Sequence, residues 1–165
     1  METHLLAVGK LRPCFREACD DYLRRLSRYG PVTERELKAA GRAATPELRV
    51  KEESARIVAA LPGRATVILL DRGGTAWSSE SLAKQVERWR VEAAPVVLVI
   101  GGAYGMGPEL ARGASFRWSL GPLTLPHELA RVIVLEQWYR AWTILRGEPY
   151  HKRGAVSPPP PAHRG

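Results

Sequence analysis

Two short apolar segments place the strongest constraint on how this chain folds. Residues 66–70 read TVILL and residues 96–100 read VVLVI, and a pair of glycines follows soon after each segment. Unbroken β-branched runs of this length are typical of strands buried on both faces of a parallel sheet. A membrane-spanning helix needs about 20 apolar residues, so neither segment has the length of a membrane anchor. We therefore expect a sheet that is covered on both faces.

The rest of the sequence alternates strand and helix patterns around these two segments. In residues 15–26, apolar side chains recur at spacings of three and four with Arg and Asp between them, which indicates an amphipathic helix. Further strands are expected at 4–8, 32–37 and 116–120, and helices at 15–26, 46–61, 79–90 and 127–145, with a short helix opening at 108. This order predicts an α/β fold with a mostly parallel sheet and helices on both faces.

Length and charge limit the domain organisation and the partners. The 165 residues fit one domain, which we expect to span 1–153; a proline-rich tail at 154–165 has too little apolar surface to fold. The net charge of +8 favours a polyanionic partner, either nucleic acid or an anionic membrane surface. The start METHLLAVGK lacks the apolar stretch of a signal peptide, so a cytoplasmic location is expected.

The cysteines and histidines follow no pattern of a metal or redox site. Cys14 and Cys19 are five residues apart in a helical segment, which suits neither a disulfide framework nor a C-x-x-C motif. No two of the four histidines have the spacing of metal ligands. We expect reduced thiols and no metal site.

The loops that follow strands are the first candidates for a ligand site. In open parallel sheets the ligand crevice lies beyond the carboxyl ends of the strands, which here points to the loops at 70–74, 101–107 and 121–126. The loop GGAYGMG has the glycine order G-x-x-G-x-G and no acidic residue about 20 positions later, so a nicotinamide-dependent dehydrogenase is poorly supported. Its glycines fit either a backbone that approaches a ligand or a tight turn.

The second candidate loop is stiff. Pro122 and Pro126 fix φ and remove backbone donors, so this loop suits an adenine-like ligand, or serves as a connector into the helix at 127–145. That helix carries Glu136 and Arg140 four residues apart, a spacing that favours an ion pair. Its aromatic residues Trp138, Tyr139 and Trp142 fit either a core or dimer interface, or a platform on which RNA bases stack.

Several segments together carry a family resemblance. LAVGK, LLDRGGTAWSSESLA, VVLVIGGAYGMG, WSLGPLTLPHELARVIVLEQWYRAW and EPYHK occur in the order and spacing of the RlmH family of bacterial rRNA methyltransferases, and the likeness covers about residues 4–152. The family is a member of the SPOUT superfamily. The resemblance implies methylation of N3 of a pseudouridine in 23S rRNA within the assembled ribosome, with S-adenosyl-L-methionine as the cofactor. It also implies a C-terminal trefoil knot and a homodimer that completes each active site, with no metal and no membrane partner.

The resemblance also assigns residues to the site. It places the cofactor against Leu70, Gly102, Gly121, Pro122, Leu123, Thr124, Leu125 and Pro126, and the reaction against His127, Glu136, Arg140, Tyr150 and His151. His151 or Glu136 would accept a proton, Arg140 would orient the base or hold a phosphate, and Tyr150 would stack or form a hydrogen bond.

Two departures from the family pattern leave an alternative function open. Lys152 stands where an Arg is common, and a proline-rich extension follows the usual end of the family's chain. Lys does not replace Arg at a bidentate contact. The alternative is a catalytically inactive ribosome-binding or RNA-binding module of the same fold.

Overall fold

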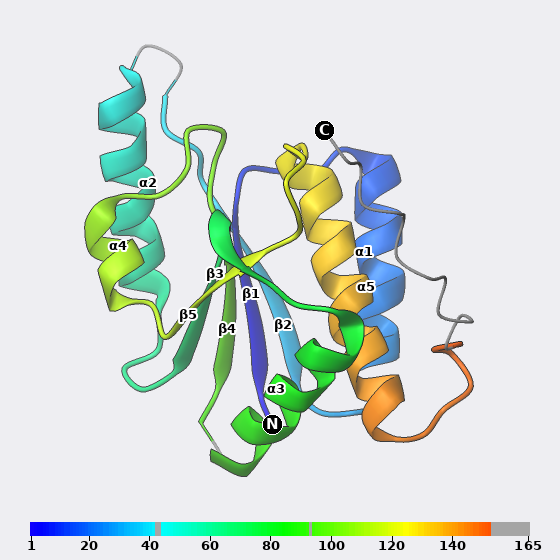
Figure 1. Cartoon of the computed structure of the whole chain (residues 1–165). Coiled ribbons are helices and arrows are strands. Elements are labelled where there is room, and N and C mark those ends of the chain that lie inside the picture. Colours follow the sequence, from blue (N-terminus) through cyan, green and yellow to red (C-terminus); the bar gives the residue numbers. More distant parts are fainter. Residues whose placement is uncertain (42–43, 93, 153–165) are drawn as a thin grey trace, which may run out of the picture.

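The computed structural model describes residues 1–41, 44–92 and 94–152 (Figure 1). The elements, in chain order, are β1 (Thr3–Val8), α1 (Pro13–Leu26), β2 (Val32–Leu37), α2 (Pro46–Ala60), β3 (Thr66–Ala76), α3 (Ser79–Glu92), β4 (Val96–Ile100), α4 (Pro108–Gly113), β5 (Phe116–Ser119) and α5 (His127–Leu145). All the predicted elements are present, most with ends within two residues of those predicted. The tail predicted at 154–165 lies outside the described residues.

The five strands form one sheet in the order β2-β1-β4-β3-β5, and every neighbouring pair is parallel. The predicted parallel sheet is therefore confirmed. All five residues of β4 are buried, as its unbroken apolar sequence requires. Because the strands are parallel, their carboxyl ends meet at one edge of the sheet.

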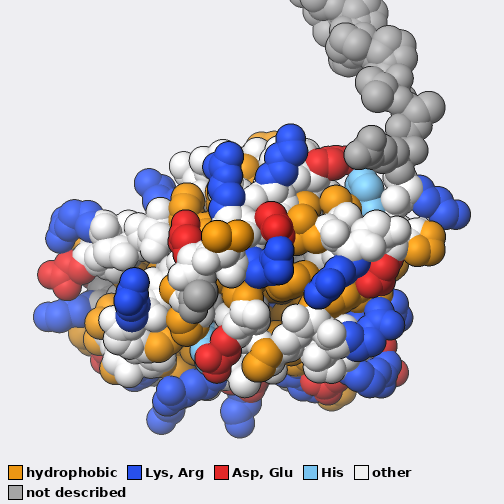
Figure 2. All heavy atoms as spheres, turned by 90° about the horizontal axis from the view of Figure 1, so that it is seen from below, with side chains coloured by type: hydrophobic (Ala, Val, Ile, Leu, Met, Phe, Trp, Pro, Cys, Tyr) orange, Lys and Arg blue, Asp and Glu red, His pale blue; other side chains and the backbone are white. Residues whose placement is uncertain are grey.

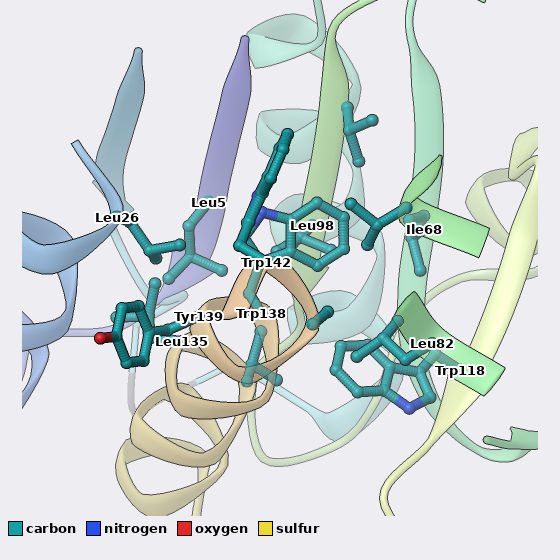
Figure 3. Close-up of a cluster of buried hydrophobic side chains, with 14 of the residues drawn as sticks. Leu5, Leu26, Ile68, Leu82, Leu98, Trp118, Leu135, Trp138, Tyr139 and Trp142 are labelled. Carbon is teal, nitrogen blue, oxygen red and sulfur yellow. The ribbon is translucent and has the colours of Figure 1, made fainter. Parts of the chain in front are cut away.

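Helices cover both faces of the sheet, each over its own apolar layer. On β1, Leu5 and Ala7 pack into a core beneath α1, α3 and α5, whereas Leu6 and Val8 pack into a smaller core beneath α2 and α4. Figure 1 shows these helices on the two faces of the sheet, and Figure 3 shows Leu5 in the larger core. Successive side chains of a strand point to opposite faces, so one apolar run supplies both layers.

The aromatic residues of α5 belong to the larger core. Trp138, Tyr139 and Trp142 are all buried (Figure 3). Trp138 also stacks on Trp89 of α3, with ring centroids 6.0 Å apart. Of the two roles that the sequence left open, the structure shows the core role. Cys19 is buried there as a free thiol, and burial raises its pKa to about 11.

Strand β3 differs from its prediction. The sequence placed a loop at 70–74, whereas β3 continues to Ala76 and pairs with β5 on both sides of a register shift between Leu70 and Thr75. Gly74 makes this close pairing possible, because a Cβ there would lie 2.6 Å from the carbonyl of Arg117. The polar and glycine residues that suggested a turn thus form an irregular part of a strand.

After β5 the chain crosses the carboxyl edge of the sheet to reach α5 on the opposite face from α4 (Figure 1). This path is consistent with the trefoil knot that the resemblance implies. Within the described ranges, none of the helices has the length and apolar character needed to span a membrane.

Candidate functional site

A cleft of about 760 Å³ lies at the carboxyl edge of the sheet. It is lined by residues 69–72 of β3, by 100–106 after β4, and by 120, 121 and 123–127 before and at the start of α5, together with Ala111, Trp118 and Ala130. Its volume is within the ordinary range for sites that bind small molecules and cofactors. The three segments correspond to the three strand-end regions that the sequence pointed to.

The glycine segment at 101–107 is both a turn and a wall of the cleft. Gly102 and Gly105 form an isolated bridge, and Gly105 has a φ of +82° that favours glycine. The backbone at Gly102 also lies close to α2, because a Cβ at this position would be 2.2 Å from Oε2 of Glu53. The amide of Gly107 donates a hydrogen bond to Oγ of Ser54, 2.8 Å away. Helix α2 therefore fixes the position of this segment.

The segment at 121–126, here called the proline segment, forms another wall of the cleft. Gly121 has a φ of +112°, and its amide donates to Oγ of Ser119 at 3.2 Å. Arg72 of β3 reaches across and donates to Oγ1 of Thr124 at 3.3 Å, which joins this segment to the irregular part of β3. Pro122 lies in the same segment, but it is not among the described residues that line the cleft.

Asp71 lies in the third segment that lines the cleft, residues 69–72 of β3. Its carboxylate accepts a hydrogen bond from the amide of Gly73 and forms an ion pair with Arg117 of β5. Burial disfavours the charged form, but the Gly73 amide and the Arg117 guanidinium outweigh it, and the pKa of Asp71 is lowered. The carboxylate therefore stays charged at neutral pH.

His127 is the one predicted reaction residue that lines the cleft in the described chain. It begins α5, directly after the proline segment. Gly9, at the end of β1, lies against its ring, since a Cβ on Gly9 would be 3.2 Å from Nε2 of His127. The next residue, Glu128, accepts hydrogen bonds from the amide and Nε of Arg12, at 2.7 and 2.9 Å.

The other predicted reaction residues gather farther along α5. Arg140 Nη2 lies 2.5 Å from Oε1 of Glu136, which confirms the predicted pair. The Tyr150 hydroxyl donates to the same carboxylate at 3.1 Å, and the Arg140 guanidinium lies 4.8 Å from the centroid of the Tyr150 ring. Burial, together with the neighbouring Tyr22 and Glu136, raises the pKa of Tyr150. His151 Nε2 lies 3.0 Å from Glu80 at the start of α3.

A single protomer does not bring the five predicted reaction residues together. Glu136 and Arg140 follow His127 on the same helix, α5, which spans His127–Leu145. At 1.5 Å per residue they lie roughly 14 and 20 Å farther along the helix axis. One chain therefore presents a cleft at one place and an acid–base cluster at another.

Sequence reasoning missed the groups that support His127. Arg131 of α5 is completely buried and binds the carbonyl of Gly9 as well as two carboxylates of β2. An arginine in a helix ordinarily reads as a surface residue, and the signal that could have found Arg131 is the pair of acidic residues Glu34 and Glu36 on β2. No set of three or more His, Cys, Asp or Glu residues placed to hold a metal occurs in the described part of the chain.

Known proteins are similar to this chain along most of its length. A family model described as "Predicted SPOUT methyltransferase" matches residues 1–151. The ribosomal RNA large subunit methyltransferase H of Rubrobacter xylanophilus is 46% identical over 155 residues, which cover 89% of this chain and 96% of the relative. The protein of the same name from Pseudomonas paraeruginosa is 39% identical over 155 residues, covering 92% of this chain and 100% of the relative.

Solved structures share the fold at low sequence identity. A tRNA (m1G37) methyltransferase from Aquifex aeolicus superimposes with a TM-score of 0.55 at 12% identity, covering 96% of this chain and 77% of the other. The Lpg2936 methyltransferase from Legionella pneumophila, solved with bound SAM, gives a TM-score of 0.50 at 16% identity. The superposition covers 86% of this chain and 66% of the Legionella chain. With the family model matched over nearly the whole described chain, the protein belongs to the SPOUT methyltransferase family.

Proposed function

We propose that this protein transfers a methyl group from S-adenosylmethionine to N3 of a pseudouridine in 23S rRNA of the assembled ribosome. The observation that carries the proposal is the cleft. Seven of the eight residues that the resemblance assigns to the cofactor line it, namely Leu70, Gly102, Gly121, Leu123, Thr124, Leu125 and Pro126. The relatives named ribosomal RNA large subunit methyltransferase H support the substrate class.

The cleft residues fit an adenosine cofactor. Glycines at 101, 102 and 105 allow close approach of backbone groups, and Leu70, Leu123 and Leu125 offer apolar surface to a flat base. The only described lining side chains with a formal charge at neutral pH are Asp71 and Arg72. When bound, S-adenosylmethionine would supply an electrophilic methyl group on a sulfonium. The same fold holds SAM in the Legionella pneumophila structure, which supports this assignment.

Methylation at a ring nitrogen requires the protein to orient the base and to accept the proton that N3 carries. Glu136 and His151 are the candidates for accepting this proton, and Tyr150 and Arg140 hold the Glu136 carboxylate in a fixed orientation. The raised pKa of Tyr150 keeps its hydroxyl protonated, so Tyr150 acts as a hydrogen-bond donor. Arg140 is placed to bind a base edge or a phosphate.

The separation of cleft and cluster supports a homodimer. Since one chain places Glu136 and Arg140 away from His127, we propose that the Glu136–Arg140–Tyr150 cluster of one protomer faces the cleft of its partner. Such an arrangement completes two equivalent sites by one two-fold axis.

The charge of the molecule fits an RNA partner. The net charge is +8, and Figure 2 shows Lys and Arg side chains scattered over the face seen there, with acidic side chains among them. A diffuse positive surface attracts RNA without reading its sequence, so the folded ribosomal surface would supply specificity. Ribosomes as substrate place the proposed activity in the cytoplasm.

The proposal is tested with methyl-labelled S-adenosylmethionine and ribosomes from cells that lack this modification, with naked rRNA in parallel. We expect label in the ribosomal sample only. Cofactor binding without label in either sample would refute the proposal and favour the inactive RNA-binding module.

A further inference from the structure

The loop at residues 9–12, between β1 and α1, lies against the His127 end of the cleft. It comes from the LAVGK segment at the start of the chain and emerges at the carboxyl edge of the sheet, beside the cleft. Gly9 begins it with a φ of +92°, a conformation that favours glycine. A Cβ at Gly9 would lie 3.2 Å from Nε2 of His127, so the loop backbone is in contact with the imidazole that lines the cleft.

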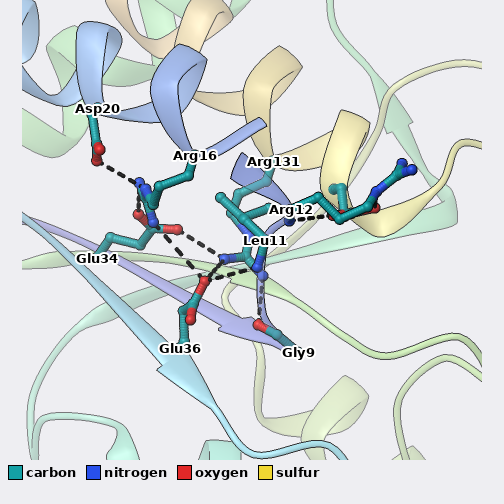
Figure 4. A network of polar contacts seen from close by, with 9 residues as sticks. Gly9, Leu11, Arg12, Arg16, Asp20, Glu34, Glu36 and Arg131 are labelled. Atoms are coloured by element: carbon teal, nitrogen blue, oxygen red, sulfur yellow. Dashed lines mark hydrogen bonds and ion pairs between the residues drawn. The ribbon is translucent and has the colours of Figure 1, made fainter. Parts of the chain in front are cut away.

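Arg131 holds this loop from inside the protein (Figure 4). Its side chain is completely buried, and Nη2 donates to the carbonyl of Gly9 at 2.9 Å. Nη1 donates to Oε1 of Glu34 at 3.0 Å and to Oε1 of Glu36 at 2.9 Å. Glu36 in turn accepts a hydrogen bond from the amide of Leu11 at 3.2 Å. The Arg131 guanidinium thus holds the loop directly, through the Gly9 carbonyl, and indirectly, through the Glu36 carboxylate that binds the Leu11 amide.

The far end of the loop is tied to the same helix. The amide and Nε of Arg12 donate to Glu128, the residue that follows His127. Helix α5 therefore binds the loop both before and after Leu11, and His127 lies next to these attachments. The loop is thus connected to α5 on both sides of Leu11, beside the imidazole at the end of the cleft.

The composition of the network argues for a positioning role. Taking an arginine and a nearly buried Glu34 out of water is costly, and apolar side chains of similar volume are often at least as stabilising as a buried ion pair. An arginine offers several donors in a fixed plane, however, and can bind a carbonyl and two carboxylates at once. An apolar core would not specify the position of the Gly9 carbonyl.

We infer that Arg131 is a positioning residue that holds the 9–12 loop against His127 and thereby fixes the imidazole at the cleft. The catalytic consequence of this inference rests on the proposed function, whereas the structural consequence does not. A displaced imidazole would slow methyl transfer without removing the walls that hold the cofactor.

The test uses the full chain and three variants. R131K keeps the charge but cannot bind three acceptors in one plane, and G9A presses on the imidazole without touching the ion pairs. R16K is the matched control, because the Arg16 side chain pairs with Asp20, Glu34 and, at 3.9 Å, Glu36 in the same network but forms no hydrogen bond or ion pair with residues 9–12 in the described structure. The backbone bond from the Arg16 amide to the Arg12 carbonyl does not depend on the side chain that R16K replaces. The readouts are the His127 imidazole resonances by NMR, assigned with H127N, and kcat beside the Kd for S-adenosylmethionine.

We expect R131K and G9A to shift the His127 resonances and R16K to leave them in place. In R131K, kcat should fall roughly tenfold while the Kd for the cofactor stays within about twofold. Unshifted His127 resonances in folded R131K, or an equal shift in R16K, would overturn the inference. If R131K does not fold, a further variant, E36Q, decides, because it weakens the bridge from Arg131 to the Leu11 amide without a new contact to the imidazole; unshifted His127 resonances in E36Q would then overturn the inference. A wild-type protein without activity would refute the proposed function, and the NMR comparison would still decide the role of Arg131.

Discussion

At the scale of single residues, the orientation of the Glu136 carboxylate is set by the groups that bind it. Arg140 pairs with it, and the Tyr150 hydroxyl donates to it at 3.1 Å. Removing one donor leaves the carboxylate with fewer partners and a less defined orientation. Because the raised pKa of Tyr150 keeps the hydroxyl protonated, this donor is present throughout the neutral pH range.

Tyr150→Phe should therefore lower turnover by roughly tenfold, because Glu136 loses a fixed orientation while the ring remains packed on Tyr139. The loss of stability should be about 1 kcal/mol, the usual net value of one hydrogen bond. Turnover is measured by label transfer and stability by urea unfolding.

Tyr29→Phe is the control, since the Tyr29 hydroxyl donates to Glu148 at 2.8 Å, outside the cluster. It should cost similar stability and leave turnover unchanged. Equal loss of turnover in both variants would contradict a specific role for Tyr150.

A second residue-scale effect concerns Asp71. Its folded-state pKa is lowered, against burial, by the Gly73 amide and Arg117, so the group contributes stability above its ordinary pKa near 3.8 and loses it as pH falls through the lower folded value. Asp71→Asn should reduce the free energy of unfolding by up to about 1 kcal/mol at pH 7. At pH 2.5 the difference from the wild type should shrink. Urea unfolding at both pH values measures this, and an equal difference at both would contradict the ion-pair account.

At the scale of elements, α2 and the glycine segment act as a pair. A Cβ at Gly102 would lie 2.2 Å from Oε2 of Glu53, a buried side chain whose other oxygen accepts a hydrogen bond from the Ala40 amide, so the carboxylate has little freedom to move aside. Ser54 holds the amide of Gly107. The cleft wall thus depends on a helix that does not itself line the cleft.

Gly102→Ala should force this segment off α2 and weaken the binding of S-adenosylmethionine by tenfold or more, at a stability cost of about 1–3 kcal/mol. Gly113→Ala is the matched control, because a Cβ at Gly113 meets no atom within 4 Å. Calorimetric titration with the cofactor measures the affinity. A Gly102→Ala protein that binds the cofactor as tightly as the wild type would show that the segment can shift without affecting the site.

Local sequence patterns predicted the elements well and the contacts between them poorly. The end of β4 follows from an apolar run that stops at Gly101, and the start of α5 from Pro126. The extension of β3 to Ala76 depends on pairing with β5, which residues 70–76 alone do not reveal. Arg131 binds Glu34 and Glu36, which are 97 and 95 residues away along the chain, so no local pattern marks it as buried.

At the scale of the whole molecule, the site is divided between two places on one chain. The loops of the cleft were predictable, because ligand sites follow the carboxyl ends of parallel strands. The family assignment is shown, whereas the dimer that would join cleft and cluster stays a prediction. Its test is whether two defective chains can complement each other.

Mixing His127→Ala with Arg140→Ala protein should restore activity if each site takes its cleft from one protomer and its cluster from the other. Random exchange makes half of the dimers mixed, each with one intact site, so about a quarter of the wild-type activity should return. Label transfer to ribosomes measures the recovery after subunit exchange. A mixture no more active than the mean of its components would contradict the shared site.

The central claim is methyl transfer to one nucleotide of ribosomal RNA. The most direct measurement is nucleoside mass spectrometry of 23S rRNA, taken from unmodified ribosomes after incubation with the protein and S-adenosylmethionine. We predict N3-methylpseudouridine at one position of the 23S rRNA, with no more than one methyl group added per ribosome. No methylated nucleoside despite cofactor binding, or a methyl group on a different base, would contradict the account.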